Sequence, residues 1–162
     1  MFARLPVILL GALLSVAACA QEQKDATASA PVAAEAGKNY FLIEPPQPTS
    51  SGDKIEVLEV FSYACVHCAH FQPYADEIKS KLPAYAQFEY LPAIFNDQWE
   101  AYARAFYCAQ SLGVLDKTHQ AVFNAVHRDH RPFRSFNDIA AFYGEQGVDS
   151  EKFTQLATSF EV

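Results

Sequence analysis

Residues 55–73 decide the fold, and they read IEVLEVFSYACVHCAHFQP. The run 55–61 is rich in β-branched and apolar residues and is bounded by turn residues, which predicts a central β-strand buried on both faces. From Cys65 onward the apolar residues recur at helical spacing, so we expect a helix over residues 65–82. The stretch therefore predicts a strand-to-helix turn with two cysteines, Cys65 and Cys68, at the start of the helix.

The other apolar patterns predict two further strands and four helices. The segments 39–44 (NYFLIE) and 88–91 (FEYL) are short, apolar and closed by prolines, which is typical of strands. Stripes of aromatic and apolar residues at helical spacing predict the helices, and Ser135 has the side chain of a helix cap. The four helices are expected over residues 99–113, 115–127, 135–147 and 150–160. This order of elements indicates an α/β (α+β) fold.

Composition limits the class of protein. The chain of 162 residues is 51% hydrophobic and 14% aromatic, which suffices for one globular domain and argues against disorder. Its 12 Lys and Arg against 19 Asp and Glu give a net charge of −7. Binding to a phosphate backbone needs a basic face, so we expect no nucleic-acid partner. Four cysteines are too few for a disulfide-stapled mini-domain, so their role must be inferred from their spacing.

The N-terminal segment indicates export. Residues 1–18 hold one arginine and an apolar run that is short for a membrane span, as expected of a signal peptide. The run ends in VAAC (16–19), which resembles the lipobox of bacterial lipoproteins and would make Cys19 a lipid anchor; ordinary cleavage after Ala20 is the alternative. Residues 19–38 are small and polar, so we expect a flexible linker, which favours lipidation. Either route leads to an oxidising compartment.

The two cysteines of the C-x-x-C motif are expected to differ in chemistry. At the start of a helix, positions three apart share one face, so the two sulfurs can form a disulfide. Cys65 is expected at or beside the N-cap, where free amide groups and the helix dipole stabilise a thiolate, so it attacks or is attacked. Cys68 lies one turn further in, keeps its proton more easily and resolves. His67 adds positive charge near the Cys65 sulfur, and stabilising the thiolate makes the disulfide a stronger oxidant.

Other uses of the motif fit the sequence less well. A zinc site needs a second ligand pair, but Cys108 stands alone and His127 and His130 are too closely spaced. Haem attachment requires a histidine directly after the second cysteine, where this chain has Ala69. A purely structural disulfide would close a loop too short to stabilise the fold much. We therefore expect redox chemistry with no metal and no organic cofactor.

Glu59 is the second candidate site residue. Strand alternation places it on the same face as Phe61, in a strand that we expect to be buried on both sides. Burial of an unpaired carboxylate raises its pKa, so Glu59 is a candidate to shuttle a proton to the Cys68 sulfur. The alternative is an acid at the strand end that contacts water. The other thiol and the remaining histidines have no expected catalytic role: Cys108 is exposed or covered by a helix, and the residues expected at the surface are His119, His127 and His130.

The stretch 55–73 resembles the DsbA family of periplasmic thiol–disulfide oxidoreductases. The shared features are acid-aromatic-Ser-aromatic around the strand end, then C-x-H-C, then aromatic-x-Pro in the helix. The likeness continues through ARAFYCAQSLGV (103–114). It implies a thioredoxin-like domain, begun by residues 39–95, with an inserted helical domain at 96–162. It also implies that Cys65 and Cys68 are the redox pair, that His67 tunes the pair and that Glu59 is the acid beneath it.

The resemblance implies a function in the periplasm. The chain would donate its Cys65–Cys68 disulfide to unfolded or folding exported proteins with free thiols, and a quinone-linked membrane partner would reoxidise it. Two alternatives remain open at this stage. One is a reductase or isomerase on the same fold, and the other is a non-enzymatic lipoprotein that only binds partners through its helical face.

The sequence departs from the family pattern in two places. Val66 stands where the family most often has proline before the histidine. The family also continues beyond the inserted helices with two strands, a closing helix and a cis-proline loop, and this chain has no proline after Pro132. We therefore expect a C-terminally truncated thioredoxin-like fold that lacks the final strands and helix. Strand 55–61 would then have an open apolar edge, and the chain alone would be poorly stable and a weak catalyst.

Overall fold

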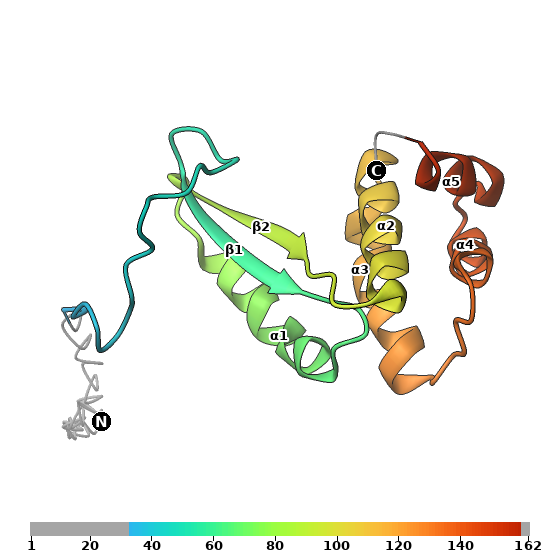
Figure 1. Ribbon diagram of the computed structural model, residues 1–162, viewed down its shortest axis with the longest axis horizontal. Coiled ribbons are helices and arrows are strands. Elements are labelled where there is room, and N and C mark those ends of the chain that lie inside the picture. The colour runs from blue at the N-terminus through green and yellow to red at the C-terminus, as the bar shows by residue number, and fades with distance from the viewer. Residues whose placement is uncertain (1–32, 160–162) are drawn as a thin grey trace, which may run out of the picture. The chain divides into compact units, whose positions relative to one another are not determined.

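The computed structural model (Figure 1) describes residues 33–159, which fall into two units, 33–46 and 47–159. The expected signal peptide (1–18), the lipidation site Cys19 and the first part of the expected linker lie outside the described residues. So does Phe160, at the end of the last expected helix.

The expected strand over residues 39–44 is wrong. The first unit contains one isolated bridge, between Ala36 and Tyr40, and its following apolar side chains are exposed: Phe41 (81%), Leu42 (69%) and Ile43 (72%). A strand exists only where a neighbour completes its hydrogen-bond ladder. Within residues 33–159, the only sheet pairs two other segments, so the apolar pattern of 39–44 has no ladder to join.

The second unit begins with a strand–helix–strand arrangement. Strand β1 (Ile55–Phe61) runs parallel to β2 (Ala86–Pro92), with Ile55 opposite Ala86 and Phe61 opposite Pro92. Helix α1 (Val66–Lys81) connects them, and Figure 1 shows the two arrows side by side with α1 along them. The bounds of β1 and α1 confirm the sequence analysis. Strand β2 extends beyond the expected 88–91 at both ends, because pairing with β1 continues along its full length.

Strand β1 is not the expected strand buried on both faces. The face that carries Glu59 lies against α1, but Val60 is 59% exposed, Leu58 is 44% exposed and the neighbouring Leu91 on β2 is 42% exposed. In the described part of the chain, β1 pairs with β2 alone. The open apolar edge that we expected is therefore confirmed, while full burial would require a further layer over the second face.

Four helical segments follow the sheet, and three of them begin at side-chain caps. Helix α2 starts at the Asn96 cap, α4 starts at Ser135 with a capping box formed by Asp138, and α5 starts at Asp149. Helix α3 continues directly into a π-helical segment, η1, so the two together cover the helix expected at 115–127. The bounds are α2 (Asp97–Ser111), α3 (Leu115–Phe123), η1 (Asn124–Arg128), α4 (Phe136–Glu145) and α5 (Ser150–Ala157).

One aromatic core joins the end of β1 to the helices. The Phe61 ring contacts Phe106 of α2 edge to face at 5.4 Å between ring centroids, and it contacts the tilted ring of Phe123 of α3 at 5.9 Å. Tyr63, two residues later, contacts Phe123 at 5.0 Å. Cys108 is also fully buried here, which confirms the helix-covered reading of this thiol. The turn that follows β1 is therefore anchored in the helical core.

The exposed apolar face of β1 generates a testable prediction about solubility. Val60→Lys places a charge on an open sheet edge, and such charges oppose edge-to-edge pairing. We expect the variant to aggregate less than the parent chain, measured by static light scattering at equal concentration. The matched control is Tyr85→Lys, which adds the same charge at a 66% exposed site just before β2. Equal improvement from both changes would contradict a role for the edge.

Candidate active site

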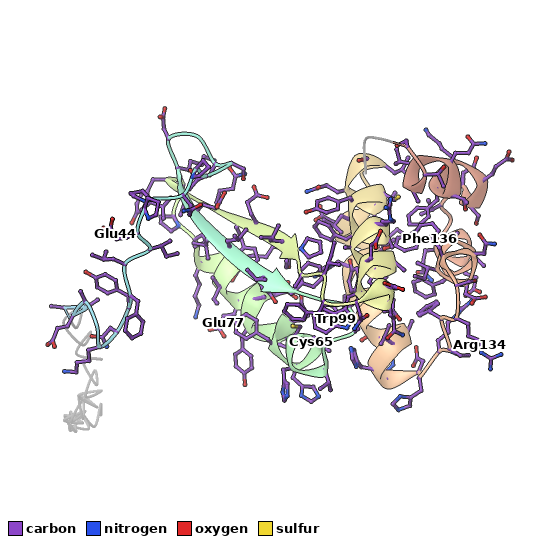
Figure 2. The ribbon with its side chains drawn as sticks, viewed as in Figure 1. Glu44, Cys65, Glu77, Trp99, Arg134 and Phe136 are labelled. Atoms are coloured by element: carbon purple, nitrogen blue, oxygen red, sulfur yellow. The ribbon has the colours of Figure 1, made fainter. Side chains whose placement is uncertain are left out.

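The two cysteines lie where β1 gives way to α1. Ser62 closes the turn that joins β1 to α1. Its carbonyl accepts the Cys65 N–H at 3.0 Å, and its hydroxyl accepts the Ala64 N–H at 3.2 Å. Cys65 is the N-cap of α1, in an extended conformation, and its Sγ accepts the Cys68 N–H at 3.3 Å. Figure 2 shows Cys65 at this junction, beside the end of the β1 arrow. The expected N-cap position is confirmed.

The cap geometry makes the two sulfurs unequal. Both thiols are free and half-buried in this structure. The amide hydrogen bond and the positive end of the helix dipole both stabilise negative charge on Cys65 Sγ. Burial raises the pKa of the Cys68 thiol to about 11, and its hydrogen bond with Cys65 adds to the shift. Cys68 therefore holds its proton at neutral pH, as the sequence analysis expected.

Cys68 shares a cavity with the two other expected site residues. The cavity has a volume of about 490 Å³, and Glu59, His67 and Cys68 supply its polar groups. The rest of its lining is apolar and comes from both strands and α1: Val57, Leu58, Val60, Phe71, Ile78 and Phe88. The His67 side chain is exposed on the first turn of α1. The structure thus brings an acid, an imidazole and the inner sulfur to one opening.

Glu59 is half-buried, and its two carboxylate oxygens have different surroundings. Oε1 accepts a hydrogen bond from Gln72 Nε2 at 3.2 Å, whereas the buried Oε2 has no hydrogen-bond partner among the described residues. Loss of solvent raises the pKa of the carboxyl, and the Gln72 bond and the charge of Lys79 oppose that shift without cancelling it. The direction of the expected pKa shift is confirmed.

His119 was expected at the surface, and this expectation is wrong. The side chain is 7% exposed, and its ring lies 4.4 Å from that of Tyr90 and 5.1 Å from that of Phe61. Its Nδ1 is 2.8 Å from Tyr63 Oη, and its Nε2 is 3.1 Å from Gln72 Oε1. Burial lowers the pKa of His119 to about 3, so the ring is neutral at physiological pH.

A signal for this burial was present in the sequence. His119 precedes Val122 and Phe123 by three and four residues, so it belongs to the apolar stripe of α3. Gln72, which is also buried, occupies the α1 face one turn beyond Cys68 and was missed in the same way. Polar residues on an apolar stripe point to buried hydrogen bonds.

The two other histidines that we expected at the surface differ from each other. His127, on η1, is half-buried, and its Nε2 lies 2.8 Å from the Tyr63 carbonyl oxygen, so it is not the free surface residue that we expected. His130 is exposed, as expected. Among residues 33–159, no group of three or more His, Cys, Asp and Glu side chains is placed to hold a metal ion. None of the helices described there is both long enough and apolar enough to cross a membrane.

Comparisons with known proteins identify relatives over most of the chain. No family profile matches it. It is 39% identical over 127 residues to the thiol:disulfide interchange protein DsbA of Pseudomonas aeruginosa, which covers 78% of this chain and 60% of that protein. It is 34% identical over 150 residues to the protein of the same name from Pseudomonas syringae pv. tomato, covering 93% of this chain and 70% of that protein.

Solved structures agree with the sequence relatives. A crystal structure of a variant of Pseudomonas aeruginosa DsbA matches with a TM-score of 0.75 and 39% identity, covering 79% of this chain and 69% of that one. The oxidoreductase DsbA from Xylella fastidiosa matches with a TM-score of 0.65 and 33% identity, covering 70% and 62% respectively. The chain therefore has their fold, although it spans only about 60% of the length of the Pseudomonas aeruginosa relative.

The unequal sulfurs predict the order in which the thiols react. With the reduced chain at pH 7, we expect iodoacetamide to alkylate Cys65 before Cys68, because the Cys68 thiol keeps its proton. Buried Cys108 is the internal control and should react only after denaturation. Peptide mass spectrometry of samples quenched over time gives the three rates. Equal rates at Cys65 and Cys68 would contradict the assignment.

The buried imidazole predicts a loss of stability in acid. Between pH 6.5 and about 3 the unfolded chain binds a proton at His119 that the folded chain does not, so stability falls as the pH falls through this window. The slope from this one group is at most about 1.4 kcal/mol per pH unit. His119→Gln should flatten the curve of unfolding free energy against pH, measured by urea titration between pH 7 and 4. A variant with an unchanged slope would show that His119 does not contribute.

Proposed function

The chain belongs to the DsbA family of thiol–disulfide oxidoreductases and has its thioredoxin-like fold, and from this premise we propose that it donates a Cys65–Cys68 disulfide to the thiols of exported proteins. One observation carries the proposal. The Cys65 sulfur caps α1 and accepts the Cys68 N–H at 3.3 Å, while the Cys68 thiol, one turn further in, keeps its proton. A thiolate leaves faster when its negative charge is stabilised, so this asymmetry suits Cys65 to bond to the substrate and to be released again.

The exchange proceeds in two steps that balance. A substrate thiolate attacks Cys65 Sγ, the Cys65–Cys68 bond breaks, and Cys68 leaves as a thiolate that takes up a proton. A second substrate thiolate then attacks the substrate sulfur of the mixed disulfide and releases Cys65 as a thiolate. The substrate dithiol loses two electrons and two protons and becomes a disulfide. The active-site disulfide gains the two electrons: Cys68 takes up one proton, Cys65 is left as a thiolate, and the second proton passes to water.

Each neighbouring group has a defined part in this scheme. Cys65 is a good leaving group in the second step because the helix terminus stabilises its thiolate. Cys68 needs a proton in the first step, and we assign its supply to Glu59, because the pKa of this carboxyl is raised and it lines the same cavity. The exposed His67 imidazole adds positive charge at the helix start when protonated.

The setting of the reaction follows from the N-terminal sequence and from the family. We propose that residues 1–18 direct the chain to the periplasm, that Cys19 carries a lipid anchor and that 19–38 form a tether. A quinone-linked membrane partner would reoxidise the cysteine pair. We also propose that 39–95 and 96–162 correspond to the thioredoxin-like part and the inserted helical domain. The strand–helix–strand arrangement followed by the helices α2 to α5 supports this division.

The function is tested by a single turnover that needs no reoxidase. The oxidised chain is mixed with a reduced peptide carrying two cysteines, and mass spectrometry follows the loss of two hydrogens from the peptide. We expect transfer by the parent chain and none by Cys65→Ser. Cys108→Ala removes a buried thiol that has no part in the proposed exchange, so this variant should transfer its disulfide to the peptide as the parent chain does. Transfer that survives Cys65→Ser would overturn the proposal.

A further inference from the structure

A chain of buried polar side chains runs from the turn before the cysteines to the acid beneath them. Tyr63 Oη lies 2.8 Å from His119 Nδ1, and His119 Nε2 lies 3.1 Å from Gln72 Oε1. Gln72 Nε2 is in turn 3.2 Å from Glu59 Oε1. Tyr63 and Gln72 are each 1% exposed, so these contacts form away from water. This series of hydrogen bonds links α3 to the turn between β1 and α1, through Tyr63, and to α1, through Gln72.

The direction of every hydrogen bond in this chain can be deduced. Gln72 Nε2 lies near two acceptors, Glu59 Oε1 and, at 3.4 Å, the Cys68 carbonyl oxygen, which fixes the amide with its NH₂ toward them. Gln72 Oε1 is therefore the acceptor for His119, so Nε2 of the imidazole carries the proton. Because the buried ring is neutral, its Nδ1 is unprotonated and accepts the Tyr63 O–H.

The direction of these hydrogen bonds gives the two carboxylate oxygens of Glu59 different roles. Oε1 is occupied as an acceptor whether the carboxyl is charged or neutral, since Gln72 can only donate to it. The proton of the neutral carboxyl is then left to Oε2, which is buried and has no hydrogen-bond partner among the described residues. An unsatisfied buried oxygen is costly, so a purely structural network would be expected to pair it. Glu59 also lines the cavity that Cys68 lines.

We propose that Gln72 and His119 are positioning residues for disulfide exchange, which hold the Glu59 carboxyl so that Oε2 is the atom that exchanges a proton with Cys68. The inference rests on the proposed function. When the Cys65–Cys68 bond breaks, Oε2 gives its proton to the departing Cys68 thiolate and Glu59 becomes a carboxylate, still held at Oε1. A proton from water at the open cavity restores the acid. When the pair is reoxidised, Glu59 first loses its proton to water at the cavity, and Oε2 then accepts the proton of the Cys68 thiol.

The test is the pH profile of a single-turnover reduction of the oxidised chain by a small dithiol, between pH 4 and 9. Rates are divided by the concentration of dithiol thiolate, so that the remaining pH dependence belongs to the protein. For the parent chain we expect this rate to fall as Glu59 ionises, and for Glu59→Gln we expect a low rate with no such fall. Gln72→Met keeps the side-chain volume but removes the donor. It should lower the acid-side rate by roughly tenfold, as for loss of one charge-assisted hydrogen bond, and lose the fall.

Variants at His119 separate positioning from packing. His119→Gln retains an N–H that can donate to Gln72 and should keep the profile of the parent chain within about twofold, whereas His119→Phe should behave like Gln72→Met. Circular dichroism verifies that each variant is folded. If Gln72→Met does not fold, Tyr63→Phe tests the same chain with minimal change to the core. Without the Tyr63 O–H the imidazole proton is free to move to Nδ1, so the acid-side rate should fall.

The outcomes distinguish this inference from the function on which it rests. A parent profile that persists in Gln72→Met or in Tyr63→Phe, while Glu59→Gln loses it, would overturn the positioning role and leave the disulfide transfer intact. A parent chain without the fall in rate would also overturn the positioning role. A parent chain that transfers no disulfide to the reduced peptide would instead overturn the proposed function.

Discussion

Helix α1 begins with a sulfur in the place where most helices have an oxygen. The first amide groups of any helix lack partners within it, and a side-chain acceptor at the N-cap normally satisfies one of them. Here the Cys65 thiol takes that place through the Cys68 N–H. The same bond caps the helix, joins the backbone of one cysteine to the side chain of the other and stabilises negative charge on the outer sulfur. The remaining site residues act on the difference between the two sulfurs, which this cap and the burial of Cys68 create together.

The aromatic core holds this cap in place. Phe61, at the last position of β1, packs on α2 and α3, and Tyr63 is fully buried two residues further on. The backbone between these rings and Cys65 therefore has little freedom, even though β1 itself is exposed on one face. A rigid anchor next to a reactive side chain keeps its geometry through the reaction. Helices α2 and α3 thus help to hold the cysteine motif in place, although the motif itself lies at the start of α1.

The sequence predicted what local signals encode and missed what distant contacts decide. The bounds of β1 and α1, the Cys65 cap and the Ser135 cap follow from spacing and from residue types within a few positions. The failed strand at 39–44 depended on a pairing partner that no local pattern reveals. His119 and Gln72 are 47 residues apart in the chain and meet only in the folded core. Glu59 was predicted because the alternation of faces along a strand is a local pattern. Its partner Gln72 was not predicted, because it lies on another element, α1.

The π-helical segment η1 limits how the length of this chain can change at residues 124–128. A π-turn accommodates one more residue than an α-turn, and such turns are frequent at functional sites. His127 lies within η1 and reaches the Tyr63 carbonyl at 2.8 Å. Deleting one residue of η1 before His127 would restore an ordinary helix and rotate the His127 side chain by about 100° around the axis. The His127 imidazole would then lose its contact with the Tyr63 carbonyl oxygen, so a shorter helix would no longer be joined to the turn that precedes the cysteines.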